Sequence, residues 1–106
     1  MIALNGHAFT SIQTFQCGIL PVYDTIVVKS FLMPDLSRFS SASSVRYGEL
    51  KDCQSRYDTL ENGDVVPQNC YSNEHAYFSS YGKQGILLIR DSDRAYIICE
   101  LIEDIQ

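Results

Sequence analysis

The sequence lacks any apolar run long enough to cross a bilayer as a helix. Its best apolar run, residues 85–89, is far short of the roughly 20 residues that a membrane helix needs. No basic residue precedes the apolar part of residues 1–6, so the start of the chain does not have the pattern of a secretory signal peptide. We therefore expect a cytoplasmic protein without a membrane-spanning segment.

The sequence also lacks the short motifs that carry common chemistries. It has no tryptophan and 2 histidines, its 6 glycines are scattered rather than gathered in a phosphate-binding loop, and no Gly-x-Ser-x-Gly motif occurs. Its cysteines are widely and irregularly spaced, at Cys17, Cys53, Cys70 and Cys99, so no Cys-x-x-Cys pair suggests zinc or redox chemistry. We expect four free thiols in a reducing compartment, with two disulfides as the alternative if the protein is exported. We predict no metal site and no cofactor.

Positive charge is scarce. Lysine and arginine number 8 against 13 aspartates and glutamates, and the net charge is −5. Residues 48–75 hold six acids and two bases, a local balance of −4, whereas residues 1–47 hold two acids and three bases. An acidic chain without clustered bases is unsuited to nucleic acid or to an anionic membrane, because both require neutralisation of phosphates. An acidic surface can instead attract a basic protein.

The composition itself indicates one globular domain spanning residues 1–106. Hydrophobic residues make up 45% and charged residues 20% of the chain, which is typical of a folded protein. Residues 22–33 are bracketed by prolines and contain a β-branched run, so they predict a strand. Residues 7–17 fit a helix or a strand, and their threonines favour a strand.

The central part of the chain predicts the main helix, over about residues 45–61. Its apolar residues recur every three or four positions, which makes one apolar face: Tyr47, Leu50, Cys53 or Gln54, Tyr57 and Leu60. Asn62 and Gly63 follow, and both tolerate the left-handed conformation that ends helices. A second, short helix is predicted over residues 73–81, with Ser72 or Asn73 as its cap.

The C-terminal region predicts a β-hairpin, with arms at residues 86–89 and 95–102 and turn residues at 91–93. Residues 94–105 also fit a helical face, and their β-prone centre favours the strand. The predicted fold class is therefore α+β, with a mostly antiparallel sheet of about four strands and the 45–61 helix packed on it.

Two residues are weak candidates for catalysis. Cys70 and His75 could act as a nucleophile and its base if the fold brought them together. No family-type motif surrounds Cys70, so we expect that the protein is not an enzyme.

The favoured hypothesis is a small, non-enzymatic, acidic protein-binding domain of the inhibitor, immunity or antitoxin type. Its binding residues would be acids on the exposed faces of the predicted helix, an acid just beyond its end, and nearby tyrosines: Asp52, Asp58, Glu61, then Asp64, and Tyr71 and Tyr77. The predicted partner is a basic protein.

Two alternatives stay open. One is a small enzyme with a site near Cys70 and His75. The other is a homo-oligomer that binds a small ligand between its subunits. A homodimer is also predicted through the edge of the C-terminal hairpin, because unpaired strand edges invite pairing with another copy.

Overall fold

The computed structural model describes residues 9–32, 38–54, 56–91 and 96–105, and all of the regular structure in these ranges is β-strand. The strands are β1 Phe9–Ile19, β2 Val22–Leu32, β3 Arg38–Ser44, β4 Gly48–Asp52, β5 Arg56–Thr59, β6 Val65–Ser72, β7 Ala76–Tyr81, β8 Gln84–Ile89 and β9 Ile97–Ile105. The α+β prediction is therefore wrong, because neither expected helix forms. No segment among the described residues is a helix capable of spanning a bilayer.

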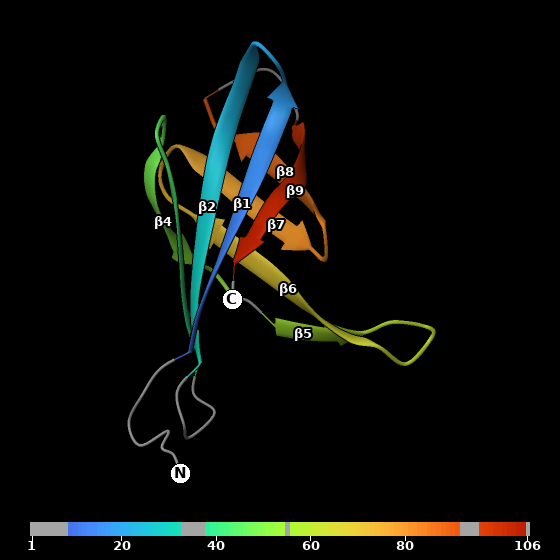
Figure 1. Cartoon of the computed structure of the whole chain (residues 1–106). Helices are drawn as coiled ribbons and strands as arrows, with labels where there is room; N and C mark the ends of the chain where they lie inside the picture. Colours follow the sequence, from blue (N-terminus) through green and yellow to red (C-terminus); the bar gives the residue numbers. More distant parts are fainter. Residues whose placement is uncertain (1–8, 33–37, 55, 92–95, 106) are drawn as a thin grey trace.

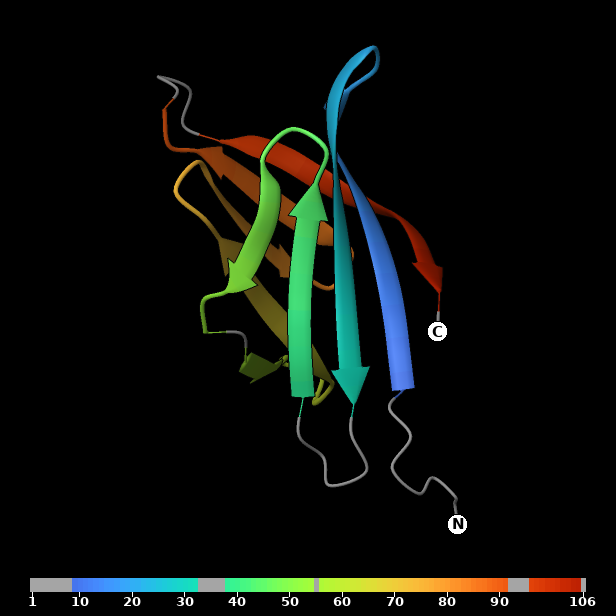
Figure 2. The ribbon, with the colours of Figure 1, turned by 90° about the vertical axis from the view of Figure 1, so that its left-hand side faces the viewer.

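The strands form one antiparallel sheet that closes on itself. Their order is β4-β3-β2-β1-β9-β8-β7-β6-β5, and an additional pairing of β4 with β6 joins the two sides into an eight-strand barrel. Figures 1 and 2 show the first strand lying beside the last, and the β1–β2 hairpin projecting beyond the turn between β3 and β4. β5 pairs with β6 outside the closed ring, so the β5–β6 hairpin extends away from the barrel in Figure 1.

The core fills the barrel with side chains of moderate size. The fully buried hydrophobic residues come from β1, β2, β3, β4, β6, β7, β8 and β9: Phe15, Cys17, Ile26, Val28, Ala42, Leu50, Tyr71, Ala76, Phe78, Leu87 and Cys99. Phe78 lies at its centre, with its ring centroid 5.2 Å from that of Phe15 and 6.5 Å from that of Tyr71. Alternate positions along β7 and β8 point inward, as the two-residue period of a strand requires.

The region predicted as the main helix forms β4 and β5 instead. Leu50 is buried as expected, but Glu49 and Lys51 on either side are exposed, which is the alternation of a short strand. Ser44, directly before the region predicted as the main helix, accepts a hydrogen bond from the Tyr47 N–H at 2.6 Å and closes the β3–β4 turn. The tendency of a serine side chain to accept a hydrogen bond from a nearby backbone N–H therefore stabilises a turn here and not the start of a helix.

Asn62 and Gly63, expected to end the helix, form the turn of the β5–β6 hairpin. Gly63 has a φ of 91°, and the Asn62 side-chain oxygen accepts the Asp64 N–H at 2.9 Å. Asn-Gly is a strong hairpin signal as well as a helix stop. The choice between the two depends on strand pairing, which the local sequence does not contain.

The second predicted helix, over residues 73–81, is also wrong. Asn73 accepts hydrogen bonds from the N–H groups of His75 and Ala76 at 2.8 and 2.9 Å, as a helix cap would, yet the chain then enters β7. Asn73 also donates to the carbonyls of Tyr47 and Glu49, at 2.8 and 3.0 Å. These long-range bonds fix the β6–β7 turn against the start of β4.

The other predicted strands are confirmed within the described residues. Residues 9–19 and 22–32 form β1 and β2, and β8 pairs with β9 as the predicted C-terminal hairpin. The helical alternatives for both regions are therefore wrong. Residues 92–95, which include most of the predicted turn, lie outside the described residues.

The four cysteines form two disulfides, so the prediction of free thiols is wrong. Cys17 in β1 bonds to Cys99 in β9, and Cys53 after β4 bonds to Cys70 in β6. Cys17 and Cys99 stand directly opposite each other in the β1–β9 register although 82 positions separate them in the sequence. Only the closure of the barrel brings them together, which is why spacing alone did not reveal the pair.

Candidate functional site

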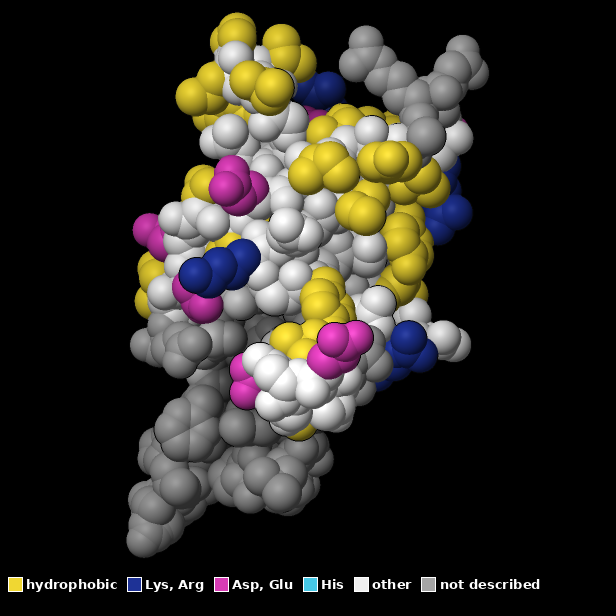
Figure 3. All heavy atoms as spheres, turned by 90° about the vertical axis from the view of Figure 1, so that its right-hand side faces the viewer, with side chains coloured by type: hydrophobic (Ala, Val, Ile, Leu, Met, Phe, Trp, Pro, Cys, Tyr) yellow, Lys and Arg dark blue, Asp and Glu magenta, His cyan; other side chains and the backbone are white. Residues whose placement is uncertain are grey.

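Exposed hydrophobic side chains gather at two places on the barrel. The first is the hairpin tip, which we define as Ile19, Leu20, Pro21 and Val22 between β1 and β2. Ile19 is 82%, Leu20 61% and Val22 75% exposed. Figure 3 shows hydrophobic side chains at the projecting end of the molecule and over the upper part of the barrel wall, with smaller groups lower down and at the edge of the view.

The second place is the outer surface of the last strands, which we call the β8–β9 face. Its exposed hydrophobic residues have exposed fractions between 37% and 60%: Tyr81, Ile86, Leu88, Tyr96, Ile98 and Ile102. Ile86 and Ile98 are direct partners in the β8–β9 register, so their side chains lie side by side on one surface. A contiguous apolar surface of this kind is unusual in a monomer and commonly marks an interaction site.

Two hollows join the hairpin tip to the β8–β9 face. One, of about 340 Å³, is lined by Gln16, Gly18, Ile19, Ile98, Cys99 and Glu100. The other, of about 220 Å³, is lined by Gln68, Ser79, Ser80, Tyr81, Gln84, Gly85, Ile86 and Ile98. Because Ile19 and Ile98 line the first hollow and Ile98 and Ile86 line the second, the hollows link the two surfaces, and we call these surfaces together the apolar band.

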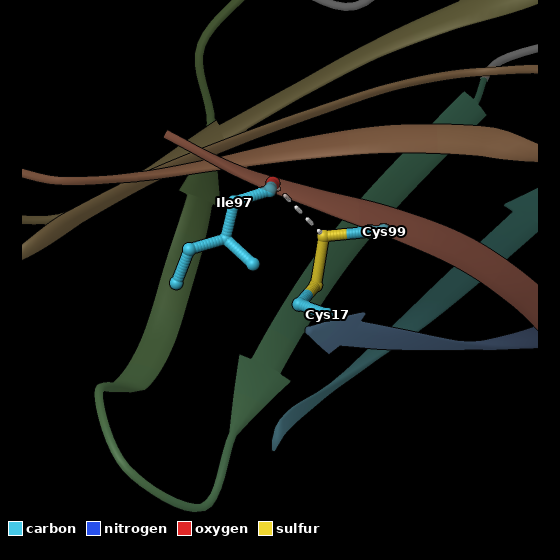
Figure 4. Close-up of a disulfide and its surroundings, with 3 residues drawn as sticks. All are labelled: Cys17, Ile97 and Cys99. Atoms are coloured by element: carbon cyan, nitrogen blue, oxygen red, sulfur yellow. Dashed lines mark hydrogen bonds between the residues drawn. A yellow bond between two sulfur atoms is a disulfide. The ribbon is translucent and has the colours of Figure 1, made fainter. Parts of the chain in front are cut away.

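The Cys17–Cys99 disulfide holds the two parts of the apolar band together. Cys17 lies two positions before Ile19, and Cys99 is the neighbour of Ile98. Figure 4 shows the sulfur of Cys99 beside the Ile97 carbonyl oxygen, 3.8 Å away. This is a contact and not a hydrogen bond, because a disulfide sulfur carries no proton. The covalent link fixes the base of the hairpin tip to β9.

An ion pair lies on the inner side of the same end of the barrel. The buried carboxylate of Asp24, on β2, contacts the guanidinium of Arg46 at 3.0 Å. Burial, together with the negative charge of Asp24, raises the pKa of the neighbouring Tyr47 above its ordinary value of 10.0, and Arg46 opposes that shift. The pair ties the β3–β4 turn to β2 below the hairpin tip.

The predicted acidic residues do not share one face. Asp52 ends β4 and is paired in register with Tyr71, whereas Glu61 and Asp64 lie exposed in the β5–β6 turn. Asp58 belongs to β5, and its side chain lies outside the described residues. The prediction places three of these acids on one helix and Asp64 just beyond its end, whereas the structure spreads the four over two strands and a loop.

The two predicted binding tyrosines have different positions. Tyr71 is fully buried and packs against Phe78, so its ring belongs to the core and not to a docking surface. Tyr77 is half-buried on the outside of β7 and lines a hollow below the Cys53–Cys70 disulfide.

Cys70 and His75 do not form a catalytic pair in this structure. The Cys70 sulfur is bonded to Cys53 and is not a thiolate nucleophile in this form. The His75 ring instead faces two exposed carboxylates, Glu74 at 3.4 Å and Asp91 at 3.7 Å. Within the described ranges, no group of three or more side chains is arranged to hold a metal ion.

A polar hollow of about 450 Å³ lies beside the Cys53–Cys70 disulfide. It is lined by Cys53, Gln54, Arg56, Gln68, Asn69, Cys70, Tyr77 and Ser79. The Arg56 Nε donates a hydrogen bond to the Gln68 side-chain oxygen at 3.1 Å. Gln54 has a φ of 100°, a conformation that costs energy in residues other than glycine.

The hairpin tip is the main feature that sequence reasoning missed. Its signal was present, because Pro21 marks a turn between two β-prone runs and its neighbours Ile19, Leu20 and Val22 are all apolar. Turn residues are usually polar, so an apolar turn needs a partner or a function. Comparisons with family models, with curated proteins and with solved structures each found no match to this chain.

Proposed function

We propose that the protein is a small, non-enzymatic protein-binding domain that contacts its partner through the apolar band. The observation that carries the proposal is the presence of two groups of exposed hydrophobic side chains, the hairpin tip and the β8–β9 face, linked by hollows that Ile98 lines. Each of the six side chains of that face presents on the order of 100 Å², so together they approach the ~800 Å² per partner of a standard interface.

The shape and rigidity of the apolar band support a protein partner with a concave apolar groove. The hairpin tip is convex and only two strands wide, and the Cys17–Cys99 disulfide stands at its base. A surface that is already rigid loses little conformational freedom on binding, which favours affinity. Tyrosine and isoleucine are residues that such interfaces bury well.

Acidic side chains beside the apolar band support the proposal that the partner has basic residues around its apolar groove. Glu100 lines the hollow between Ile19 and Ile98, and the whole chain carries a net charge of −5. The exposed acids Glu61 and Asp64 of the β5–β6 turn add to the negative electrostatic potential of the protein. Charge of this kind mainly speeds the encounter of two proteins, whereas the apolar contacts slow their separation.

The two disulfides support an oxidising compartment for this function. Structural disulfides persist outside the cytosol and are rare in reducing compartments. We therefore propose that the protein works in an oxidising environment, in place of the cytoplasmic location expected from the sequence.

The test is binding by matched surface variants. Wild-type protein, Ile98→Glu and Val65→Glu are immobilised and exposed to an extract of the source organism. Val65 is the matched control, because it is 61% exposed against 60% for Ile98 and lies away from the apolar band, on β6. We expect one protein to be retained by wild type and Val65→Glu and to be lost from Ile98→Glu. Equal retention by all three baits would contradict the proposal.

A second copy of the chain is a further outcome of this test. The predicted dimer through a free hairpin edge is not available at β8 or β9, because β8 pairs with β7 and β9, and β9 pairs with β8 and β1. Self-association through the apolar band would bring two such surfaces face to face. Sedimentation of wild type and Ile98→Glu over a range of concentrations identifies it as an association that the variant loses.

A further inference from the structure

The closure of the barrel is weakest where β4 meets β6. Only Lys51↔Ser72 and Asp52↔Tyr71 are paired there, whereas β1 and β2 pair along their whole length from Phe9↔Leu32 to Ile19↔Val22. A short ladder has few hydrogen bonds to lose, so it opens at a lower free energy than a long one. We call this short junction the β4–β6 seam.

The Cys53–Cys70 disulfide reinforces the β4–β6 seam at one end. Cys53 directly follows β4, Cys70 belongs to β6, and the Cys53 N–H donates a hydrogen bond to the Cys70 carbonyl at 2.9 Å. At the other end the Asn73 amide crosses between the same two strands, to the carbonyls of Tyr47 and Glu49. The disulfide is the covalent part of this closure.

The two disulfides differ in their access to solvent. Cys17 and Cys99 are each 1% exposed and lie inside the core. Cys53 and Cys70 are only partly buried, and both line the 450 Å³ polar hollow. Cys99 also lines the 340 Å³ hollow, but almost none of its surface is exposed there. A small thiol can therefore reach the second disulfide more readily than the first.

The hollow also suits the chemistry of thiol–disulfide exchange. Arg56 lines it together with Cys53 and Cys70. A guanidinium favours the thiolate over the thiol, so it assists the approach of an attacking thiolate and stabilises the cysteine thiolate that leaves.

We propose that Cys53–Cys70 is a site of reversible thiol–disulfide exchange that releases the β4–β6 seam, with a small-molecule thiol as its reductant. A thiolate of the reductant attacks one cysteine sulfur, forms a mixed disulfide with it and expels the other cysteine as a thiolate. A second reductant thiolate attacks the reductant sulfur of that mixed disulfide, which frees the first cysteine and leaves an oxidised reductant. Two electrons pass from two thiols to the cysteine pair, and two protons accompany them at neutral pH.

The expected consequence is local. With the disulfide reduced, two residue pairs and the Asn73 bonds are the non-covalent contacts left to hold the β4–β6 seam, so the seam opens more often, while Cys17–Cys99 still joins β1 to β9. The adjoining 220 Å³ hollow shares Gln68 and Ser79 with the polar hollow, so loosening of β6 reaches one end of the apolar band.

The test is the order in which the two disulfides are reduced. Wild-type protein is titrated with dithiothreitol at neutral pH, trapped with iodoacetamide and mapped by mass spectrometry. We expect Cys53 and Cys70 to be labelled at least tenfold faster than Cys17 and Cys99. Simultaneous reduction, or earlier reduction of Cys17–Cys99, would overturn the proposal.

A second measurement tests the release of the seam. Hydrogen exchange of the selectively reduced protein should rise at least tenfold at the amides of β4 and β6 and stay unchanged at β1 and β9. Selective reduction without a change in exchange at β4 and β6 would refute the proposal that this disulfide holds the β4–β6 seam closed.

Arg56→Gln provides a separate control, since it should slow reduction by anionic glutathione more than reduction by neutral 2-mercaptoethanol. Equal slowing by both reductants, or by neither, would remove Arg56 from the site.

Discussion

Gly85 shows how tightly the barrel interior is packed around one aromatic ring. It is buried on β8, and a Cβ atom built there would lie 2.8 Å from the Phe78 ring and 3.2 Å from the Cβ of Cys99. The absence of a side chain at Gly85 is therefore what lets the Phe78 ring occupy the centre of the core. Neither neighbour can move freely, because Phe78 packs on Phe15 and Tyr71, and Cys99 is held by its disulfide.

We expect Gly85→Ala to destabilise the protein by about 1–3 kcal/mol, the usual cost of adding a methyl group to a filled core. The matched control is Gln84→Ala, since Gln84 precedes Gly85 on the same strand and is exposed. That change should shift the free energy of unfolding by less than about 0.5 kcal/mol. Urea denaturation measures both, and equal effects would mean that the Phe78 ring does not lie over Gly85.

Tyr47 gives a pH dependence whose sign can be worked out. Its pKa in the folded protein is raised above 10.0, first by burial and then by Asp24. Below pH 10.0 the tyrosine is neutral in both the folded and the unfolded state, so it adds no pH dependence there. As the pH rises above 10.0, the unfolded chain ionises first, which favours unfolding until the folded pKa is passed.

We expect Tyr47→Phe to reduce the loss of stability that occurs just above pH 10. The other tyrosines are common to both proteins, so the difference between the two pH profiles isolates Tyr47. Urea denaturation of wild type and variant at neutral pH and just above pH 10 measures it. A loss of stability that is the same in both proteins would show that burial of Tyr47 is too slight to matter.

β4 lies in the region whose apolar spacing predicts a helix, although the region forms strands. Its buried Leu50 lies between the exposed Glu49 and Lys51, and the strand ends at Asp52. We expect Leu50→Ala to cost about 2–5 kcal/mol, because a cavity would remain in the closed barrel. Lys51→Ala should change stability by less than about 0.5 kcal/mol. The far-ultraviolet circular dichroism spectrum of wild type should lack the double minimum of a helix, whose presence would contradict the strand assignment of this region.

The two longest strands could be predicted from the sequence, and the two shortest could not. β1 and β2 run for 11 residues each, long enough for β-branched content and flanking prolines to identify them. β4 and β5 have 5 and 4 residues, too few to show a two-residue period. The apolar residues of these two strands fall by coincidence at helical spacing once the turn between them is included.

The candidate site was less predictable than the fold, because it depends on register. Ile86 and Ile98 become neighbours only when β8 and β9 pair, and the hollow between Ile19 and Ile98 requires β1 beside β9. Tyrosine is common at binding surfaces, yet Tyr71 faces inward because of its position in β6. No local pattern distinguishes the two faces of a strand whose partners are unknown.

The two disulfides enclose loops of very different length, so they restrict the unfolded chain to different extents. Cys17–Cys99 joins the first and last strands and spans 82 positions, whereas Cys53–Cys70 spans 17. In the chain-entropy description, a cross-link stabilises the fold by restricting the unfolded ensemble, and the restriction grows with the logarithm of the loop. The two loops correspond to roughly 4–5 and roughly 3 kcal/mol.

We therefore expect Cys17→Ser/Cys99→Ser to destabilise the protein more than Cys53→Ser/Cys70→Ser does. The gap should exceed the entropic difference of about 1–1.5 kcal/mol, because the first pair of cysteines is buried in the core and its serine hydroxyls would have to be buried with it. The second double variant should keep a cooperative unfolding transition, since the strands around the Phe78 core stay joined by Cys17–Cys99. Thermal unfolding of the two variants and of wild type, all without added reductant, measures the order. A Cys53→Ser/Cys70→Ser protein that is the less stable of the two would show that the β4–β6 seam, and not the β1–β9 junction, governs the closure of the barrel.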